Sequence, residues 1–329
     1  MSGKTLNLQN TIFIQRIIIM NNLKITALCA ISGLTSSLVC AEPVKMLSLD
    51  WTSQQVLTKV LGKLLEQNNV PVEYVYTDAR SQWYKLANNQ GDVQVEVWEG
   101  SMASKYQQLI DAGNIVEGGT HVATTREDWW YPDYAEEVCP GLPDWKALKN
   151  CHQAFAEGRK KGIYYTGPWE KPDAARIRAL DLQFDVAKLK DGAEINQKIE
   201  KYIAEKKPLL IFNWSPNWVE AKYKGKFVEF PAHDDDCEKK ASWGVNPKFK
   251  WDCGNPTGGW LKIAISKSLS DKSQCAVDTI NSFSLDNGQI AMAAMLVDNQ
   301  KMSVEDAVNK WLEENKASMD KWTSHASCG

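Results

Sequence analysis

The stretch KMLSLDWTSQQVLTKVLGKLLEQNNVPVEYVY, residues 45–76, decides the fold class. Its first part, Lys45–Leu49, predicts a strand. The segment TSQQ that begins at Thr52 predicts a capping box at the start of a helix, because a glutamine stands three residues after the threonine. The apolar residues that follow recur on one helical face: Val56, Leu57, Val60, Leu61, Leu64 and Leu65. A proline then precedes a second strand, Val72–Tyr76. Strand, helix, strand is the order of an α/β protein.

The alternation of strands and helices continues along the chain. Further predicted strands are Val93–Trp98, Gly162–Tyr165, Pro208–Asn213 and Lys226–Phe230. Predicted helices are Ser81–Asn89, Ser101–Asp111, Asp173–Leu180, Glu194–Glu205, Pro216–Tyr223 and Val304–Asn315. We expect Ser303 to cap the last of these helices, and we expect that helix to pack against the N-terminal part of the chain. Thr124–Pro143 breaks the pattern and predicts a crossover, and Trp260–Ser266 predicts the return. We therefore expect lobe 1 to contain residues 42–124 and 264–329, and lobe 2 residues 125–263.

The N-terminal residues indicate export. From Met20 the chain has a positive residue, Lys24, then an apolar stretch and the small-residue site Val39-Cys40-Ala41, which together predict a secretory signal peptide. Residues 1–19 are then an upstream extension, and translation starts at Met1 or Met20. Val39 does not fit a lipid-attachment box, so we favour cleavage after Ala41. No long apolar span follows, and we expect a soluble periplasmic product.

Charge and cysteine content narrow the class of protein. The net charge of −3 becomes more negative when residues 1–41 are removed, because that segment holds basic residues and no acidic ones. This disfavours nucleic acid as a partner. The six cysteines after the signal predict disulfides in an exported chain. Fifteen connectivities are open, and local clustering favours Cys139–Cys151, Cys237–Cys253 and Cys275–Cys328. No C-x-x-C pair occurs and there are four histidines, so we expect no zinc site.

Tryptophans stand at the ends of several apolar runs. They are Trp51 after LSLD, Trp98 after VQVEV, Trp129 and Trp130 after RED, Trp169 after YYTGP, and Trp214 after LLIFN. Ligands in α/β proteins gather at the carboxyl ends of parallel strands, so these indoles are expected to meet at one pocket. A cluster of indole faces suits a methylated ammonium group, which cannot donate a hydrogen bond.

Two lobes joined by two crossings, in an exported chain, describe a hinged clamp. The sequence resembles substrate-binding proteins of glycine betaine-type ABC importers, and within that group the trimethylamine N-oxide-binding proteins. The stretches that carry the resemblance are Asp50-Trp51-Thr52, VEVWEG (95–100), TREDWWYP (125–132), CPGLPDWKAL (139–148), FNWSPNW (212–218), KFVEFP (226–231) and DCGNPTGGWLKIA (252–264).

The resemblance implies a function as well as a fold. The fold is a two-lobe periplasmic binding-protein clamp of type II, with a hinge of two crossover segments. The ligand is a small methylated amine, with trimethylamine N-oxide favoured over glycine betaine, and the partner is an ABC permease in the inner membrane. We expect a monomer without cofactor and without enzymatic activity. Choline, carnitine and dimethylsulfoniopropionate carry a similar onium head, and the sequence does not separate these ligands.

Seven residues are predicted to bind the ligand: Trp51, Trp98, Glu99, Trp130, Tyr131, Trp169 and Trp214. Trp51 fits a core role equally well by pattern alone, and the resemblance favours the ligand. Consecutive residues of a strand point to opposite sides, so one of Trp129 and Trp130 is expected in the cleft. Glu127 and Asp128 are secondary acid candidates.

The alternative is an exported carbohydrate-binding protein or glycoside-active enzyme that stacks sugars on its tryptophans. Glu96 and Glu99 are the acid pair that such an enzyme needs, but their spacing turns them to opposite sides of a strand. The motifs G-x-S-x-G, H-E-x-x-H and G-x-G-x-x-G are absent. The acidic run His233–Asp236 indicates a surface loop, since consecutive acids cannot all face one calcium ion.

Overall fold

The computed structural model describes residues 42–169 and 171–323, whose strands form two mixed sheets. The first sheet has the strand order β2 (Val72–Tyr76), β1 (Val44–Ser48), β3 (Val93–Trp98), β11 (Leu261–Ser266) and β4 (Ile115–Thr120). β1 is parallel to β2 and β3, whereas β11 is antiparallel to β3 and β4. The predicted signal peptide, its cleavage site and both candidate start codons lie outside the described residues.

The second sheet has the strand order β10 (Thr257–Gly259), β5 (Thr125–Pro132), β8 (Ile211–Ser215), β6 (Gly162–Thr166) and β7 (Phe184–Lys188), and β9 (Gly225–Phe227) also pairs with β5. β6 is parallel to β7 and β8. β5 is antiparallel to β8, β9 and β10. Because β5 is antiparallel to β8, the amino end of β5 lies beside the carboxyl end of β8, where Arg126 is paired with Ser215.

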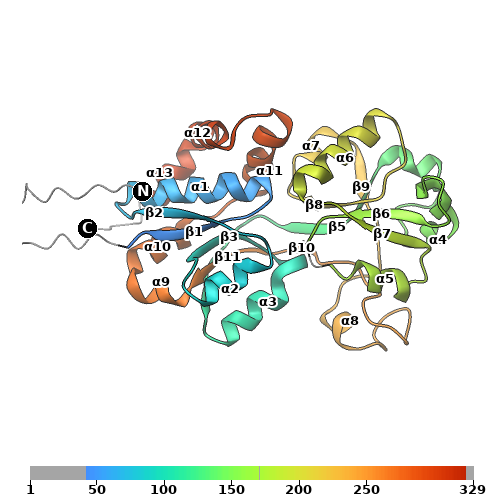
Figure 1. Ribbon diagram of the computed structural model, residues 1–329, viewed down its shortest axis with the longest axis horizontal. Coiled ribbons are helices and arrows are strands. Elements are labelled where there is room, and N and C mark those ends of the chain that lie inside the picture. Colours follow the sequence, from blue (N-terminus) through green and yellow to red (C-terminus); the bar gives the residue numbers. More distant parts are fainter. Residues whose placement is uncertain (1–41, 170, 324–329) are drawn as a thin grey trace, which may run out of the picture. The chain divides into compact units, whose positions relative to one another are not determined.

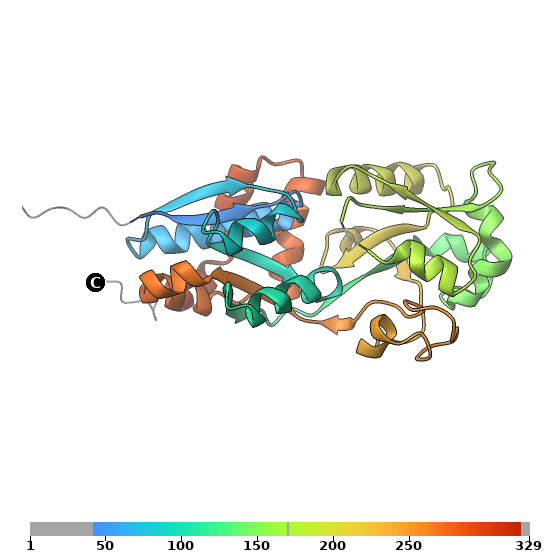
Figure 2. The same ribbon diagram turned by 60° about the horizontal axis from the view of Figure 1, so that its bottom comes forward.

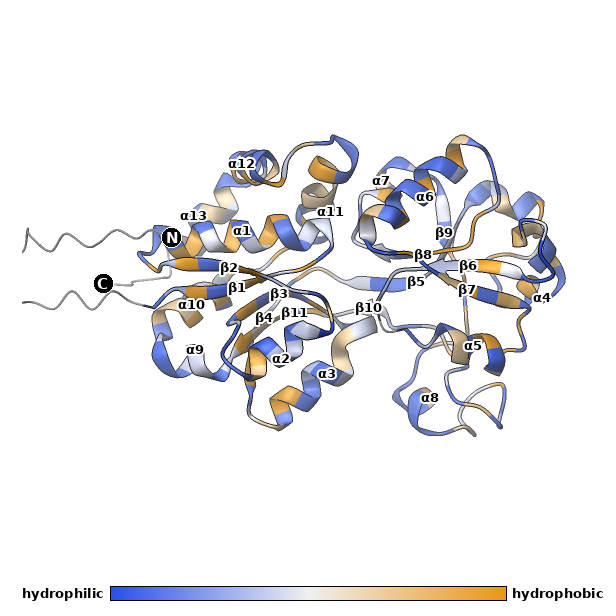
Figure 3. Ribbon diagram, in the orientation of Figure 1, coloured by the Kyte–Doolittle hydropathy of each residue, from blue (hydrophilic) through white to orange (hydrophobic). Residues whose placement is uncertain are grey.

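Helices cover the first sheet, with α1 above and α2 and α3 below it in the view of Figure 1. They are α1 (Thr52–Gln67), α2 (Ser81–Ala87), α3 (Glu99–Asp111), α9 (Lys267–Lys272), α10 (Gln274–Ser282), α11 (Asn287–Ala294), the π-helical turn η4 (Met295–Asn299), α12 (Val304–Glu314) and α13 (Lys316–Thr323). All six apolar residues predicted on the buried face of α1 are fully buried. Each contributes about 1.5–3 kcal/mol of transfer free energy. Figure 3 shows the corresponding alternation of hydrophobic and hydrophilic residues along α1.

The C-terminal helix α12 packs against α1, as predicted. Ser303 caps it by accepting a hydrogen bond from the backbone nitrogen of Asp306 at 3.1 Å. Trp311, fully buried, donates its Nε1–H to the backbone oxygen of Gln289 in α11. The C-terminal part of the chain therefore completes the core of lobe 1, although β1 to β4 come from its N-terminal part.

Helices and turns of the second sheet are η1 (Asp133–Glu137), η2 (Trp145–Ala147), α4 (Leu148–Cys151), η3 (His152–Phe155), α5 (Asp173–Ala179), α6 (Gly192–Ala204), α7 (Val219–Lys222) and α8 (Asp235–Lys239). The disulfide Cys139–Cys151 links the turn that follows η1 to the end of α4, and Cys237–Cys253 closes the loop that contains α8. These are two of the three pairings that the sequence favours. Cys275 is also disulfide-bonded, and its predicted partner Cys328 lies outside the described residues.

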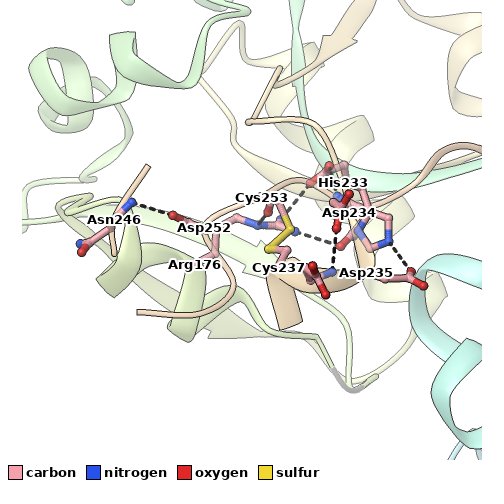
Figure 4. Close-up of a disulfide and its surroundings, with 11 residues drawn as sticks. Arg176, His233, Asp234, Asp235, Cys237, Asn246, Asp252 and Cys253 are labelled. Atoms are coloured by element: carbon pink, nitrogen blue, oxygen red, sulfur yellow. Dashed lines mark hydrogen bonds and ion pairs between the residues drawn. A yellow bond between two sulfur atoms is a disulfide. The ribbon is translucent and has the colours of Figure 1, made fainter. Parts of the chain in front are cut away.

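The Cys237–Cys253 loop is attached to lobe 2 by a buried arginine (Figure 4). Arg176 Nε donates to the backbone oxygen of Cys253 at 2.7 Å. Asp234 caps α8 by accepting from the backbone nitrogen of Asp236, so the acidic run is used in helix capping. In the described ranges, no group of three or more His, Cys, Asp or Glu side chains is arranged to hold a metal ion.

Two chain segments pass side by side between the sheets (Figures 1 and 2). The first runs from β4 into β5, and the second from β10 into β11. Thr125 at the start of β5 is paired with Gly259 at the end of β10, so the two crossings are joined by main-chain pairing. Such a double connection is the hinge of a two-lobe clamp.

Some predicted elements differ from those observed. The Thr52 capping box is wrong, because Trp51 is the N-cap residue without a side-chain bond, and Thr52 Oγ1 donates to Asp298 Oδ1 at 2.7 Å instead. The segment Thr125–Pro132, predicted as part of an irregular crossover, is strand β5, which pairs with β8, β9 and β10. Strands β4 and β7 were not predicted, since glycines and charges interrupt their apolar pattern. Among the described residues, no helix combines the length and apolar character needed to cross a membrane.

Candidate ligand-binding site

A small cavity lies between strand ends of the two sheets. Trp51 follows β1 and Trp98 ends β3 in lobe 1, whereas Phe212 and Trp214 belong to β8 in lobe 2. The complete lining is Trp51, Trp98, Ser101, Met102, Glu127, Trp169, Phe212 and Trp214. Five of these eight side chains are aromatic and one is a carboxylate, which is the composition suited to a methylated cationic centre.

One buried carboxylate holds both indoles of lobe 1. Trp51 Nε1 donates to Glu96 Oε2 at 2.6 Å, and Trp98 Nε1 donates to the same oxygen at 3.2 Å. Ser53 Oγ is a third donor, at 3.1 Å. Burial raises the pKa of Glu96 to about 7, although these three hydrogen bonds oppose the shift. Glu96 Oε1 has no partner among the described residues. This carboxyl group fixes the orientation of two rings and can change its charge near neutral pH.

The rings of lobe 2 are held by one another. Trp169 lies 5.7 Å from Trp214 and 5.6 Å from Phe212 between ring centroids, and Phe212 lies 5.8 Å from Trp214. Such contacts contribute about 0.5–1.5 kcal/mol each beyond the area they bury. Trp169 also packs on the backbone at Gly167, where a Cβ atom would lie 2.3 Å from the indole Cζ3 atom. Glycine at this position therefore lets the loop after β6 place Trp169 at the cavity.

The two walls touch through Trp169. Its ring meets that of Trp51 edge to face at 6.5 Å, and its Nε1 lies 3.5 Å from Asp50 Oδ1. Desolvation is the main cause that raises the pKa of Asp50. The first residue of α6, Gly192, also approaches this point, since a Cβ added there would lie 3.7 Å from both Trp51 Cβ and Trp214. The cavity is therefore closed on this side by side chains from both lobes.

The lining carboxylate comes from the start of β5. Glu127 Oε1 accepts a hydrogen bond from Lys171 Nζ at 2.7 Å, and both side chains are buried. The second oxygen, Glu127 Oε2, is buried without a partner among the described residues. Lys171 Nζ also lies 4.6 Å from the centroid of the Phe212 ring. Glu127 thus brings a carboxylate group to the cavity lining, beside an ammonium group of the protein.

Comparison with known proteins identifies the family. Residues 42–314 match the family described as the substrate binding domain of ABC-type glycine betaine transport system. The chain belongs to this family. A curated relative, the trimethylamine N-oxide-binding protein of Pelagibacter ubique (strain HTCC1062), is 30% identical over 315 residues, which are 92% of this chain and 98% of the relative.

Solved structures show the same fold at low sequence identity. An ABC-transporter choline binding protein in complex with choline aligns with a TM-score of 0.69 and 15% identity, over 87% of this chain and 93% of that one. Lactococcal OpuAC, closed on glycine betaine, aligns with a TM-score of 0.64 and 18% identity, over 86% of this chain and 99% of that one. The two-lobe clamp predicted from the sequence is confirmed.

Family membership also settles the class of function. This glycine betaine-type binding protein is the extracytoplasmic substrate-binding component of an ABC importer for quaternary amines, and it is not an enzyme. The glycoside-active alternative is not favoured. Members of the family work with a membrane permease.

The structure brings four of the seven predicted site residues together at the cavity: Trp51, Trp98, Trp169 and Trp214. The other three do not line it. Glu99 Oε2 accepts from the backbone nitrogen of Trp260 at 3.0 Å, which places this carboxylate at the hinge. Trp130 is fully buried, and a Cβ added to Gly225 would lie 1.9 Å from its ring. The hydroxyl of Tyr131, also fully buried, donates to Glu136 Oε1.

The direction of β5 explains why Trp130 lies away from the cavity. The rule that ligands meet the carboxyl ends of strands holds for parallel strands, but β5 is antiparallel to β8. Glu127 is paired with Trp214, and Trp130 is paired with Ile211, three residues further from the cavity along β8. The amino end of β5 therefore reaches the cavity. Trp129 does not line it either, because its ring stacks on Tyr164 at 3.9 Å in the core of lobe 2.

Sequence reasoning missed several residues of the site. Glu127 was a secondary candidate, and Glu96 was considered only as half of a catalytic acid pair. Phe212, Ser101 and Met102 carry no local signal, since a phenylalanine in a strand and small or flexible residues in the first turns of a helix are common in cores. The pattern VEVWEG does contain a usable signal, because a glutamate inside an otherwise apolar, buried strand needs donors, and indole N–H groups supply them.

Proposed function

We propose that this protein captures trimethylamine N-oxide, or failing that glycine betaine, in the cavity between its two lobes, and delivers it to a permease in the inner membrane. The observation that carries the proposal is a cavity walled by four indoles and a phenyl ring, with one buried carboxylate oxygen left without a partner. The curated trimethylamine N-oxide-binding relative supports the choice of the N-oxide.

The walls match the chemistry of the trimethylated nitrogen. Its positive charge is spread over methyl groups, so it is bound by ring faces and carboxylates at van der Waals distance. Each desolvated ring face contributes about 0.5–2 kcal/mol. Four or five such faces, together with the apolar area that closure buries, are enough for micromolar affinity after the cost of association.

The lobes are proposed to act as the two halves of a clamp. In the open form each half presents part of the ring set, Trp51 and Trp98 on one side and Trp169 and Trp214 on the other. Closure about the Thr125–Gly259 crossing brings the halves over the ligand and expels water. The contacts between Trp51 and Trp169 belong to the closed form.

Export supports the same function. A signal peptide cleaved near Ala41 would deliver a monomeric receptor to the periplasm, where the disulfides Cys139–Cys151 and Cys237–Cys253 are stable. The N-terminal residue of the protein isolated from the periplasm tests this point. An N-terminus upstream of residue 41, or a protein retained in the cytoplasm, contradicts it.

The decisive measurement is a calorimetric titration of the protein beginning at residue 42 with trimethylamine N-oxide, glycine betaine, choline and a neutral disaccharide. Trimethylamine N-oxide is expected to bind tightest, and the disaccharide is expected to give no heat of binding. Failure of all three methylated compounds to bind would refute the proposed function. Tight binding of glycine betaine alone would support the proposed receptor function but identify glycine betaine as the ligand.

A further inference from the structure

The protein places a cation of its own against two residues that line the proposed ligand cavity. The side chain of Lys171 is only 2% exposed. Its ammonium group contacts two residues of the cavity lining, Glu127 at 2.7 Å and the Phe212 ring at 4.6 Å. A carboxylate and a ring face are also the groups that would hold a ligand cation. Lys171 therefore shares these partners with any ligand that enters.

The pairing of Lys171 with Glu127 is specific. Asp173, two residues along the chain, accepts from Trp129 Nε1 at 2.8 Å and lies 3.9 Å from Arg176, and it feels the charge of Lys171 without an ion pair to it. Arg176 itself is paired with Asp128. Among the described residues that line the cavity, Glu127 is the single carboxylate, and Lys171 is the cation beside it.

This arrangement has a consequence for ligand charge. A carboxylate alone in a ring-lined cavity favours a ligand with net positive charge, by Coulomb attraction in a medium of low effective dielectric constant. The ammonium of Lys171 cancels that preference. An ammonium also carries three donors, of which the bond to Glu127 uses one. An oxygen attached to the methylated nitrogen can accept one of the others, whereas a fully methylated cation cannot.

We infer that Lys171 is a specificity-determining residue, which makes the cavity select net-neutral methylated amines that carry an anionic oxygen over net-cationic ones. The inference rests on the proposed function, which it sharpens from methylated amines in general to zwitterions. Lys171 supplies the positive charge that a cavity lined by rings and the Glu127 carboxylate alone would lack. Glu127, through its unpartnered oxygen, remains in contact with the positive end of the ligand.

The test uses two probes of nearly equal shape, trimethylamine N-oxide and tetramethylammonium, which differ by the exchange of an oxygen for a methyl group. Both are titrated calorimetrically into the wild-type protein and into the variants Lys171→Met, Lys171→Arg and Glu127→Gln. The wild-type protein is expected to prefer the N-oxide. Lys171→Met is expected to shift the ratio of the two dissociation constants towards tetramethylammonium by about tenfold or more. Lys171→Arg keeps the charge and is expected to shift the ratio by less than about threefold.

Glu127→Gln gives a second, independent measurement of the ratio of the two dissociation constants, because it leaves Lys171 without its counter-charge. Here the ratio is expected to move in the opposite direction, further towards the N-oxide, so the inference can be judged even when Lys171→Met does not fold. A ratio that stays within about twofold of wild type in the folded charge-removing variants overturns the inference, as does a wild-type protein that binds both probes equally. A wild-type protein that binds no methylated compound refutes the proposed function itself.

Discussion

The two walls of the cavity are held in place by different kinds of interaction. In lobe 1, Trp51 and Trp98 donate their indole N–H groups to one buried carboxylate, Glu96. In lobe 2, Trp169 and Trp214 are held by ring contacts with each other and with Phe212. A hydrogen bond constrains each indole separately, whereas a cluster of rings loses several contacts when one ring is removed. The comparison teaches that rings of equal chemistry need not respond equally to substitution.

Substitution of one indole in each wall gives the largest expected effect. Trp214→Leu removes a ring face and also two contacts that support Trp169 and Phe212, so a loss of affinity of about 100-fold is expected. Trp98→Leu removes a ring face, but Glu96 still holds Trp51, and about tenfold is expected. Calorimetric titration with the ligand measures both losses.

The matched control is Trp243→Leu, in the part of lobe 2 closed by the Cys237–Cys253 disulfide, away from the cavity lining. Its dissociation constant should stay within about twofold of wild type. A greater loss of affinity for Trp98→Leu than for Trp214→Leu would contradict the expectation that the ring cluster of lobe 2 is more sensitive to substitution than the two indoles of lobe 1. A loss of affinity for Trp243→Leu equal to that for Trp214→Leu would contradict the assignment of this cavity as the ligand-binding site.

The next largest expected effect is a pH-dependent difference in stability between the wild-type protein and the variant Glu96→Gln. It tests the buried carboxyl group of Glu96 in lobe 1. Burial raises the pKa of Glu96 to about 7 from an ordinary value of 4.5, so the folded protein holds this proton more tightly than the unfolded chain. The associated stability is complete below about pH 4.5 and is lost as the pH rises through 7. Glu96→Gln cannot lose a proton, and its amide oxygen can still accept from the two indoles.

Thermal unfolding at pH 5 and pH 8 measures this effect. The variant is expected to gain stability relative to wild type as the pH rises, by at most about 3 kcal/mol. A stability difference between Glu96→Gln and wild type that is constant from pH 5 to pH 8 would show that Glu96 does not titrate in this range.

The smallest expected effect concerns Tyr131, which the sequence placed in the site and the structure places in the core of lobe 2. Tyr131→Phe removes the hydrogen bond to Glu136 and leaves the ring in place. The free energy of unfolding is expected to fall by about 1 kcal/mol, with no change in the dissociation constant of the ligand. A loss of ligand affinity without a loss of stability would instead show that Tyr131 belongs to the ligand-binding site.

Much of the site could be predicted because it depends on strand ends. Trp51, Trp98 and Trp214 each lie in or directly after an apolar run, and their place at the cavity follows from the tendency of such ends to meet. Glu127, by contrast, precedes two tryptophans that are equally good candidates by pattern. Only its pairing with Trp214 in an antiparallel register shows that the cavity lies at the amino end of β5.

The α/β class, the family and the tryptophans that supply most of the ring faces follow from the sequence alone, because periodicity, strand ends and short motifs are local properties of the chain. The other features of the site depend on the tertiary structure. It set the direction of β5, brought Lys171 beside Glu127 from 44 residues away in sequence, and gathered two indoles around Glu96. These arrangements depend on contacts between distant residues, and a local pattern cannot specify which distant residue will supply a charge or a hydrogen-bond donor.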